Sequence, residues 1–181
     1  MKNLLALALL LLGLFSLANA QSDDWVTVTS KDGNFSVLVP AQPGFESKPG
    51  ELNAQDAKTG AVLSKKVRFT ANIYTSIGTG EAYLAGWADY EPGFVFNVQG
   101  ELAANRDNFV KGVNATLISE RKISYAGNPG LEFVAKSTSM NIKARVYIFG
   151  KRPYILVAMD GDPSFPNADK FFSSFNYMKH R

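Results

Sequence analysis

The segment between residues 142 and 159 carries the clearest pattern of apolar and polar positions in the chain. Every second residue in Ile142–Ile148 is apolar, a period of two that is typical of a β-strand. Tyr154–Met159 is apolar at every position, as expected of a strand that is covered on both faces. Gly150–Pro153 lies between them and predicts a tight turn. The pattern therefore predicts a β-hairpin at the centre of a sheet, with packed layers on both of its faces.

Shorter strands are predicted along the rest of the chain. Trp25–Thr29 and Phe35–Val39 flank an Asp-Gly turn, which is a strong hairpin signal. Residues 61–74 alternate so that one face is buried and the other is wet, and residues 82–90 and 131–135 are also expected to be strands. Residues 116–125 are more polar and predict an edge strand or an exposed face. Residues 40–60 have little apolar content and several Gly and Pro residues, so they are expected to form a loop, and residues 127–130 a turn.

Two helices are expected. The first begins after Asn97, a plausible N-cap, and its apolar stripe consists of Leu102, Phe109 and Val113. The second is expected to hold Pro166 in its first turn, with an aromatic face made by Phe165, Ala168, Phe172 and Phe175. Residues 176–181 are expected to be a polar tail. The order of strands, helix, strands and helix predicts the α+β class, a predominantly antiparallel β-sheet flanked by helices.

The N-terminal residues predict export. One Lys precedes an apolar run, and the run ends in Ala18-Asn19-Ala20, as in a secretory signal peptide with a cleavage site before Gln21. The alternative is a membrane anchor, but the run is shorter than the roughly 20 residues that a spanning helix needs. We therefore expect a signal peptide over residues 1–20, a single domain over residues 21–181 that does not span the membrane, and a periplasmic or secreted protein. Since there are no cysteines, disulfides and thiol chemistry are not expected.

Charge and residue types exclude several activities. The formal net charge is only +3 and the basic residues are scattered, so nucleic-acid binding is not expected. With no Cys and with His180 as the one histidine, catalysis by a nucleophile and a histidine base is not expected, nor are a zinc site or another cofactor. Acid/base catalysis by carboxylates remains open, with candidates at strand ends and loops: Asp89, Glu91, Asp160 and Asp162. Asp160 and Asp162 have a simpler interpretation, which is that they shape a turn and cap the last helix.

Aromatic and charged residues on the predicted strands form a candidate binding surface. Tyr83, Trp87 and Tyr90 either fill the core or contribute to a binding patch, since Tyr and Trp are enriched at interaction hot spots. Glu132 lies on a strand that is expected near the strand of Arg145, so the two side chains are candidates for an ion pair. Tyr147 completes the set of candidate binding residues.

Short motifs are spread over nearly the whole predicted mature chain. They are Trp25, Gly33-x-Phe35-Ser36-Val37 up to Pro40, Gly127-x-Pro129-Gly130-x-Glu132-Phe133, Arg145-x-Tyr147-x-x-Gly150, and Ser173-Ser174-Phe175. Together they resemble the exported PsbP-like proteins of bacteria. The resemblance implies an α/β/α sandwich like that of the photosystem protein PsbP, the periplasmic DcrB-like proteins and a nuclear factor that binds the GTPase Ran. Such members bind other proteins. Photosynthetic members have been linked to metal binding through His and carboxylates, but the one histidine here, His180, is in the tail, so no metal site is carried over.

Three functions remain in view. The leading one is a non-enzymatic module that binds another protein or an envelope component, and it predicts an exposed apolar or aromatic patch. A carboxylate-dependent hydrolase predicts a cleft with two facing carboxylates. A small-ligand carrier predicts a closed apolar pocket between helix and sheet.

Overall fold

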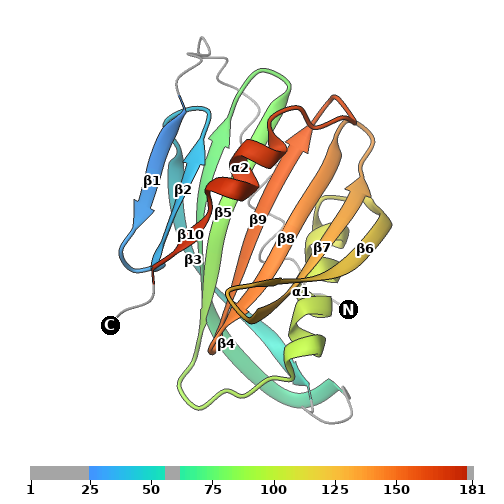
Figure 1. Ribbon diagram of the computed structural model, residues 1–181. Helices are drawn as coiled ribbons and strands as arrows, with labels where there is room; N and C mark the ends of the chain where they lie inside the picture. Colours follow the sequence, from blue (N-terminus) through green and yellow to red (C-terminus); the bar gives the residue numbers. More distant parts are fainter. Residues whose placement is uncertain (1–24, 56–61, 179–181) are drawn as a thin grey trace.

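The structure is a computed structural model, and it describes residues 25–55 and 62–178. The predicted signal peptide, its cleavage site before Gln21, and His180 lie outside the described residues. Within them, the chain folds as an α+β protein with a predominantly antiparallel sheet and two helices, as the sequence predicts (Figure 1).

Two antiparallel sheets contain all of the strands in the described part of the chain. The larger sheet has the order β3-β4-β5-β9-β8-β7-β6, and the smaller has the order β1-β2-β10. The strands are β1 (Val26–Ser30), β2 (Phe35–Val39), β3 (Gly44–Gln55), β4 (Val62–Ile77), β5 (Glu81–Tyr90), β6 (Thr116–Tyr125), β7 (Asn128–Lys136), β8 (Asn141–Phe149), β9 (Arg152–Asp160) and β10 (Asn176–Tyr177).

The predicted central hairpin is confirmed. It consists of β8 and β9, and β9 is the middle strand of the larger sheet. Ile142, Val146 and Val157 are completely buried, because the hairpin is covered on both faces. Pro153 pairs with Ile148 near the start of β9, where the strand begins at the turn.

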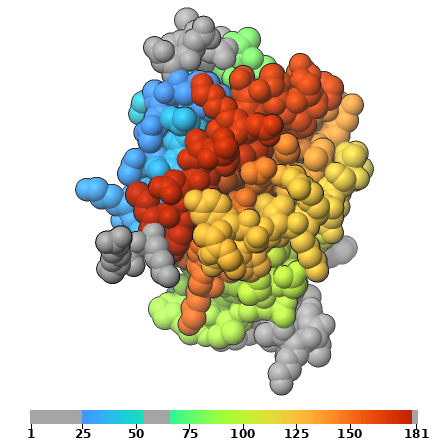
Figure 2. Space-filling model, in the orientation of Figure 1, coloured from blue at the N-terminus to red at the C-terminus, as the bar shows by residue number. Residues whose placement is uncertain are grey.

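Different layers cover the two faces of the larger sheet. Helix α1 (Val98–Gly112) packs on one face, over a mainly aliphatic core that includes Leu102, Ile142 and Val157. The smaller sheet and helix α2 (Ala168–Ser174) cover the other face, over a core rich in aromatic rings. In Figure 1, α2 lies in front of the larger sheet and α1 behind it. Figure 2 shows the segment of α2 and β10 between the smaller sheet and the β6–β7 hairpin.

Both helices form where apolar periodicity predicts them, with one shift. The Asn97 side chain accepts a hydrogen bond from the backbone N–H of Gly100 at 3.0 Å and caps α1 as expected. The prediction that Pro166 lies in the first turn of the last helix is wrong, because α2 begins at Ala168 after the N-cap Asn167. Of the expected aromatic face, Ala168 and Phe172 lie in α2 and are buried, Phe175 is the buried C-cap residue, and Phe165 lies before the helix; Phe171, next to this face, is completely buried.

The expectation of a loop over residues 40–60 is also wrong, because β3 occupies Gly44–Gln55. This strand pairs with β4 from Gly44 opposite Thr75 to Gln55 opposite Val62. At the sheet edge β3 bonds to a neighbour on one side only, so Pro49 and polar side chains are tolerated there. Pairing with β4, rather than burial of its own apolar side chains, holds β3 in the sheet.

Three smaller expectations are corrected as well. The turn expected at residues 127–130 is shorter, since β7 begins at Asn128 and pairs there with Tyr125. The expected polar tail forms β10 at its start, where Tyr177 pairs with Phe35 of β2 and stacks on Phe149 at 4.0 Å. The wet face expected for β4 is interrupted by Asn72, which is buried.

Candidate functional site

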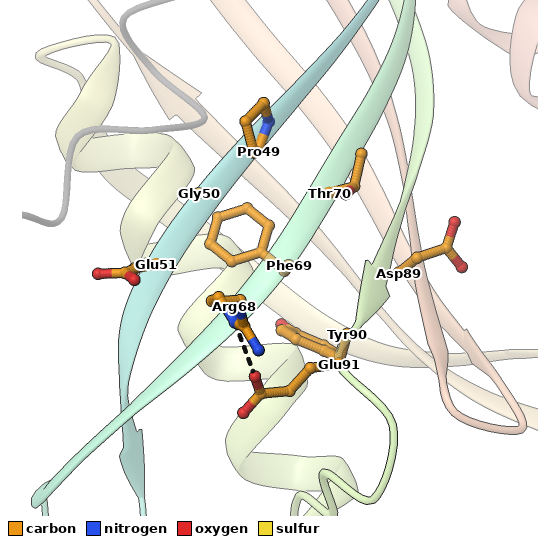
Figure 3. A pocket seen from close by; sticks show the side chains of 9 residues that line it. All are labelled: Pro49, Gly50, Glu51, Arg68, Phe69, Thr70, Asp89, Tyr90 and Glu91. Carbon is orange, nitrogen blue, oxygen red and sulfur yellow. Dashed lines mark hydrogen bonds and ion pairs between the residues drawn. The ribbon is translucent and has the colours of Figure 1, made fainter.

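A groove lies across the middle of β3 and β4 and the end of the neighbouring strand β5 (Figure 3). Its volume is about 570 Å³, which is within the range of small-molecule sites. Three consecutive residues of β3, three of β4, and the last two of β5 with the residue that follows line it: Pro49, Gly50, Glu51, Arg68, Phe69, Thr70, Asp89, Tyr90 and Glu91. The groove is open to solvent, and both charged and aromatic residues line it.

The register of the strands places the polar residues of this groove opposite one another. Arg68 lies opposite Glu51 of β3, and on its other side its backbone carbonyl accepts a hydrogen bond from the N–H of Glu91 at 2.9 Å. The Arg68 Nε also donates to Glu91 Oε2 at 3.2 Å. One step along the strands, Thr70 lies between Pro49 and Asp89. Because alternate residues of a strand point to the same face, these six side chains share one face of the sheet.

The residues between these two rows point to the opposite face of the sheet, where Phe69 and Tyr90 form an aromatic cluster. Phe69 pairs with Gly50, and a Cβ at Gly50 would lie 2.5 Å from the Phe69 ζ-carbon, so the ring needs a glycine at this position. The Phe69 ring centroid is 6.1 Å from that of Tyr90, and the Tyr90 ring is 4.9 Å from Phe94 and 5.7 Å from Phe96. The cluster connects the groove to the start of α1.

Asp89 links the groove to the smaller sheet. Its carboxylate accepts hydrogen bonds from Trp87 Nε1 at 2.9 Å and from Arg152 Nε at 2.5 Å. Arg152 also donates through a terminal nitrogen to the carbonyl of Asp32, at 2.7 Å, in the β1–β2 turn. One arginine therefore fastens the turn of the smaller sheet to the groove end of β5.

Tyr90 links the groove to α1 through a buried carboxyl group. The Tyr90 hydroxyl donates to Glu101 Oε1, and Asn105 Nδ2 donates to the same oxygen at 2.8 Å. Burial raises the pKa of Glu101, and these two hydrogen bonds oppose that rise only in part. Burial also raises the pKa of Tyr90, with the nearby Glu101 adding to the effect, so the phenol keeps its proton. The predicted residue Tyr90 is therefore a half-buried wall of the groove.

Glu132 forms the second charged cluster. Its two carboxylate oxygens accept hydrogen bonds from Arg121 Nε and Arg145 Nε, each at 2.7 Å. The predicted pairing of Glu132 with Arg145 is thus confirmed, while Arg121 is a partner that the sequence does not predict. Burial disfavours the charged form of Glu132, but the two arginines outweigh it and lower the pKa of this carboxyl. The Arg145 guanidinium also lies 4.5 Å from the ring centre of Phe172 in α2.

The other residues of the candidate binding surface lie in the interior. Tyr83 is 1% exposed, Trp87 4% and Tyr147 5%, in accordance with the core alternative for the aromatic set. Tyr83 donates from its hydroxyl to Glu81 Oε2 at 2.9 Å. Tyr147 lies across from Gly130, where a Cβ would be 2.6 Å from the tyrosine ring. A direct role of these residues in binding stays a prediction.

Asp160, the last residue of β9, and Asp162 shape a turn as expected, but they do not cap the last helix, because its N-cap is Asn167. Asp160 Oδ1 accepts from the N–H of Asp162 at 2.8 Å, and Asp162 Oδ1 accepts from the N–H of Ser164 at 2.8 Å. The bond from Ser164 lowers the pKa of Asp162. Within residues 25–55 and 62–178, no group of three or more His, Cys, Asp or Glu residues is placed to hold a metal ion. No helix in this part of the chain is long and apolar enough to cross a membrane.

The arrangement defines a class of structure, an α+β sandwich of the PsbP type. The chain is similar to cyanobacterial PsbP (CyanoP) from Synechocystis sp. PCC 6803, whose solution structure matches with a TM-score of 0.54 at 12% sequence identity. The match covers 91% of this chain and 98% of the other. No protein-family model matches the sequence. A comparison with curated proteins gives no match either. The likeness therefore shows the PsbP-like fold.

Proposed function

We propose that this protein is an exported, non-enzymatic accessory module that binds another protein through the groove on β3, β4 and the end of β5. The observation that carries the proposal is the groove itself, an open depression of about 570 Å³ whose lining includes four charged residues together with Phe69 and Tyr90. Interfaces are commonly built in this way, with aromatic and Arg anchors inside a polar rim.

Export is part of the same proposal, and it has two supports. The N-terminal sequence has the basic start, apolar run and small-residue ending of a signal peptide. The PsbP-like fold is the second support, since the exported PsbP-like proteins are those that the sequence motifs resemble. We infer that residues 21–181 form a single domain after cleavage.

The groove fits the two alternative functions less well. A hydrolase needs one carboxyl group that donates a proton and another that acts as base or nucleophile. Here Asp89 accepts a hydrogen bond from Arg152, and Glu91 accepts one from Arg68. Each carboxylate is therefore already paired with a guanidinium group. A carrier for an apolar ligand needs an enclosed apolar cavity, whereas this groove is open and carries four charged side chains.

Site-specific photo-crosslinking in cells that produce the protein tests the proposal. A photoreactive amino acid is placed at Glu51 in the groove or at Lys122 on β6, two exposed positions on the opposite edge strands of the larger sheet. We expect one discrete crosslinked protein from position 51 and none from position 122. The charge reversal Glu91→Lys should reduce that product while leaving the melting temperature unchanged. Absence of a product at position 51, or the same products at both positions, would overturn the proposal.

A further inference from the structure

The Arg121–Glu132–Arg145 cluster has hydrogen-bond donors that the fold does not use. Each arginine donates to Glu132 through its Nε. Arg145 also hydrogen-bonds the phenol of Tyr147, whereas Arg121 has no hydrogen-bond partner other than Glu132 among the described residues. A guanidinium carries five N–H bonds, and four of them are on the terminal nitrogens. Two sets of planar donors are therefore placed on β6 and β8, on either side of β7.

These donors are held in position before any ligand arrives. Arg121, Glu132 and Arg145 occupy directly opposed register positions on β6, β7 and β8. Glu132 is 6% exposed and fixes both arginines at 2.7 Å, while Phe172 covers the Arg145 guanidinium at 4.5 Å. The Arg121 side chain is 66% exposed, so the cluster is accessible from solvent. A binding site that is already ordered loses less conformational entropy when its ligand binds.

Tyr147 adds a further donor beside the cluster. Burial raises the pKa of its phenol, and the neighbouring Arg145 opposes that rise only in part, through its charge and a hydrogen bond to the phenol. The hydroxyl is therefore protonated at neutral pH and can donate a hydrogen bond.

The charge of the cluster selects the ligand. Arg121 and Arg145 contribute two positive charges and Glu132 one negative charge, which leaves one positive charge uncompensated. The nearby Lys143 does not add to it, because Lys143 Nζ lies 3.6 Å from Asp169. A single carboxylate neutralises this charge, and its planar pair of oxygens matches the guanidinium fork. A phosphate with a charge near −2 would leave an excess of negative charge.

We propose that the Arg121–Glu132–Arg145 cluster is a binding site for a carboxylate group. The site goes beyond the proposed function, because it lies on β6, β7 and β8. These strands are at the opposite edge of the larger sheet from the groove on β3, β4 and β5. The carboxylate belongs either to a free small acid or to an acidic residue of a partner. Glu132 acts as the positioning residue that aims both arginines at it.

NMR titration of the ¹⁵N-labelled protein, purified as the cell produces it, tests the site. The probes are acetate, inorganic phosphate and chloride at equal ionic strength, and the signals are the Nε–H resonances of Arg121 and Arg145. We expect acetate to give saturable shifts and chloride to give none. Weaker binding of acetate than of phosphate would overturn the proposal, and so would shifts that do not saturate.

Two substitutions distinguish binding by the planar guanidinium donors from attraction by positive charge alone. Arg121→Lys keeps the positive charge at an exposed position, and we expect it to weaken acetate binding by about tenfold because the planar donors are lost. Arg68→Gln removes an exposed arginine from the groove on the other side of the sheet and should leave acetate binding unchanged. Equal binding by the wild type and Arg121→Lys would contradict the role of the fork.

The source of the carboxylate is determined with two peptides, acetyl-Gly-Glu-Gly-amide and its Gln counterpart. Tighter binding of the Glu peptide than of acetate, lost in the Gln peptide, assigns the site to a protein ligand. Equal binding of acetate and the Glu peptide assigns it to small free acids. Because the groove is not involved, failure of this titration leaves the crosslinking result at Glu51 unaffected, and the reverse also holds.

Discussion

Glu132 and Glu101 are almost equally buried, at 6% and 8% exposure, but they lie in opposite electrostatic settings. Glu132 is between two guanidinium groups on the strands β6 and β8, whereas Glu101 receives its hydrogen bonds from a phenol and an amide. The pKa of Glu132 is lowered and that of Glu101 is raised. The comparison teaches that burial alone does not determine the state of a carboxyl group, because the charge of its partners decides whether desolvation is overcome.

The largest effect is expected when Glu132 loses its charge. Glu132→Gln should reduce the free energy of unfolding by about 3 kcal/mol at pH 7, because a neutral amide leaves two arginines without their counter-charge. Urea unfolding followed by tryptophan fluorescence measures the loss. Glu120→Gln on the same edge of the sheet is the control, since the Glu120 pair with Arg106 is partly exposed and its loss should cost less than about 1 kcal/mol. Equal losses in the two variants would contradict the special role of Glu132.

A double-mutant cycle sharpens the same point. Arg145→Met alone should be destabilising, but combined with Glu132→Gln it should cost less than the sum of the single losses, by about 1 kcal/mol. Residues that interact directly show such coupling, whereas independent residues do not. Additive losses in urea unfolding would mean that the 2.7 Å contact between Arg145 and Glu132 contributes no stability.

Removal of the neutral donor to Glu101 should have an intermediate effect. Tyr90→Phe deletes the hydroxyl that donates to Glu101 and should cost about 2 kcal/mol, the range for hydrogen bonds to charged groups. The loss should be smaller in a Glu101→Gln background, where the acceptor is neutral. Tyr74→Phe is a matched control on the neighbouring strand, since its hydroxyl has no hydrogen-bond partner among the described residues. Equal costs for the two Tyr→Phe variants would rule out a stabilising Tyr90–Glu101 bond.

The smallest expected effect is the change in folding stability with pH, and its sign should be opposite for the two glutamates. The unfolded pKa of Glu is about 4.3. Because the folded pKa of Glu132 is lower, its contribution to stability is present above about pH 4.3 and is lost as pH falls through the folded pKa. Because the folded pKa of Glu101 is raised, its contribution is present below about pH 4.3 and is lost as pH rises through the folded pKa.

Stability curves of the wild type, Glu132→Gln and Glu101→Gln between pH 3 and pH 8 measure these two slopes. When the pKa of a group differs by one between the folded and the unfolded chain, its contribution to stability changes by about 1.4 kcal/mol, so changes of about 1 kcal/mol are expected. The advantage of the wild type over Glu132→Gln should grow with rising pH, and its advantage over Glu101→Gln should shrink. Slopes of the same sign would contradict the comparison.

The sequence predicts those parts of the fold in which a segment's own pattern determines its structure. The β8–β9 hairpin has both a strict alternation and a fully apolar strand, and α1 has a cap and a stripe. The sequence does not predict β3, because its pairing with β4, rather than its own composition, keeps it extended. The same reason applies to β10, since two residues become a strand only through contact with β2.

The sequence predicts the pairing of Glu132 with Arg145 but not the pairing of Glu132 with Arg121, and the register of β6 and β7 explains why. Arg121 lies opposite Glu132 once the β6–β7 turn is centred on Ala126 and Gly127. A turn over residues 127–130, which the Gly and Pro residues there predict, shifts the register and hides the pair. The Tyr90–Glu101 contact has no comparable signal, because it joins the end of a strand to a helix through tertiary packing alone.

The pairing of β10 with β2 has a consequence for the order of folding. Phe35 of β2 is completely buried, and its neighbours include Phe175 as well as Tyr177 at the register position opposite it. A ribosome releases residues 35 and 177 far apart in time. The β1–β2 segment emerges early. Its aromatic side chains therefore stay exposed to water until almost the whole domain has emerged. Long-range closure of this kind slows folding and gives a chaperone that recognises exposed aromatic residues a defined period in which to bind.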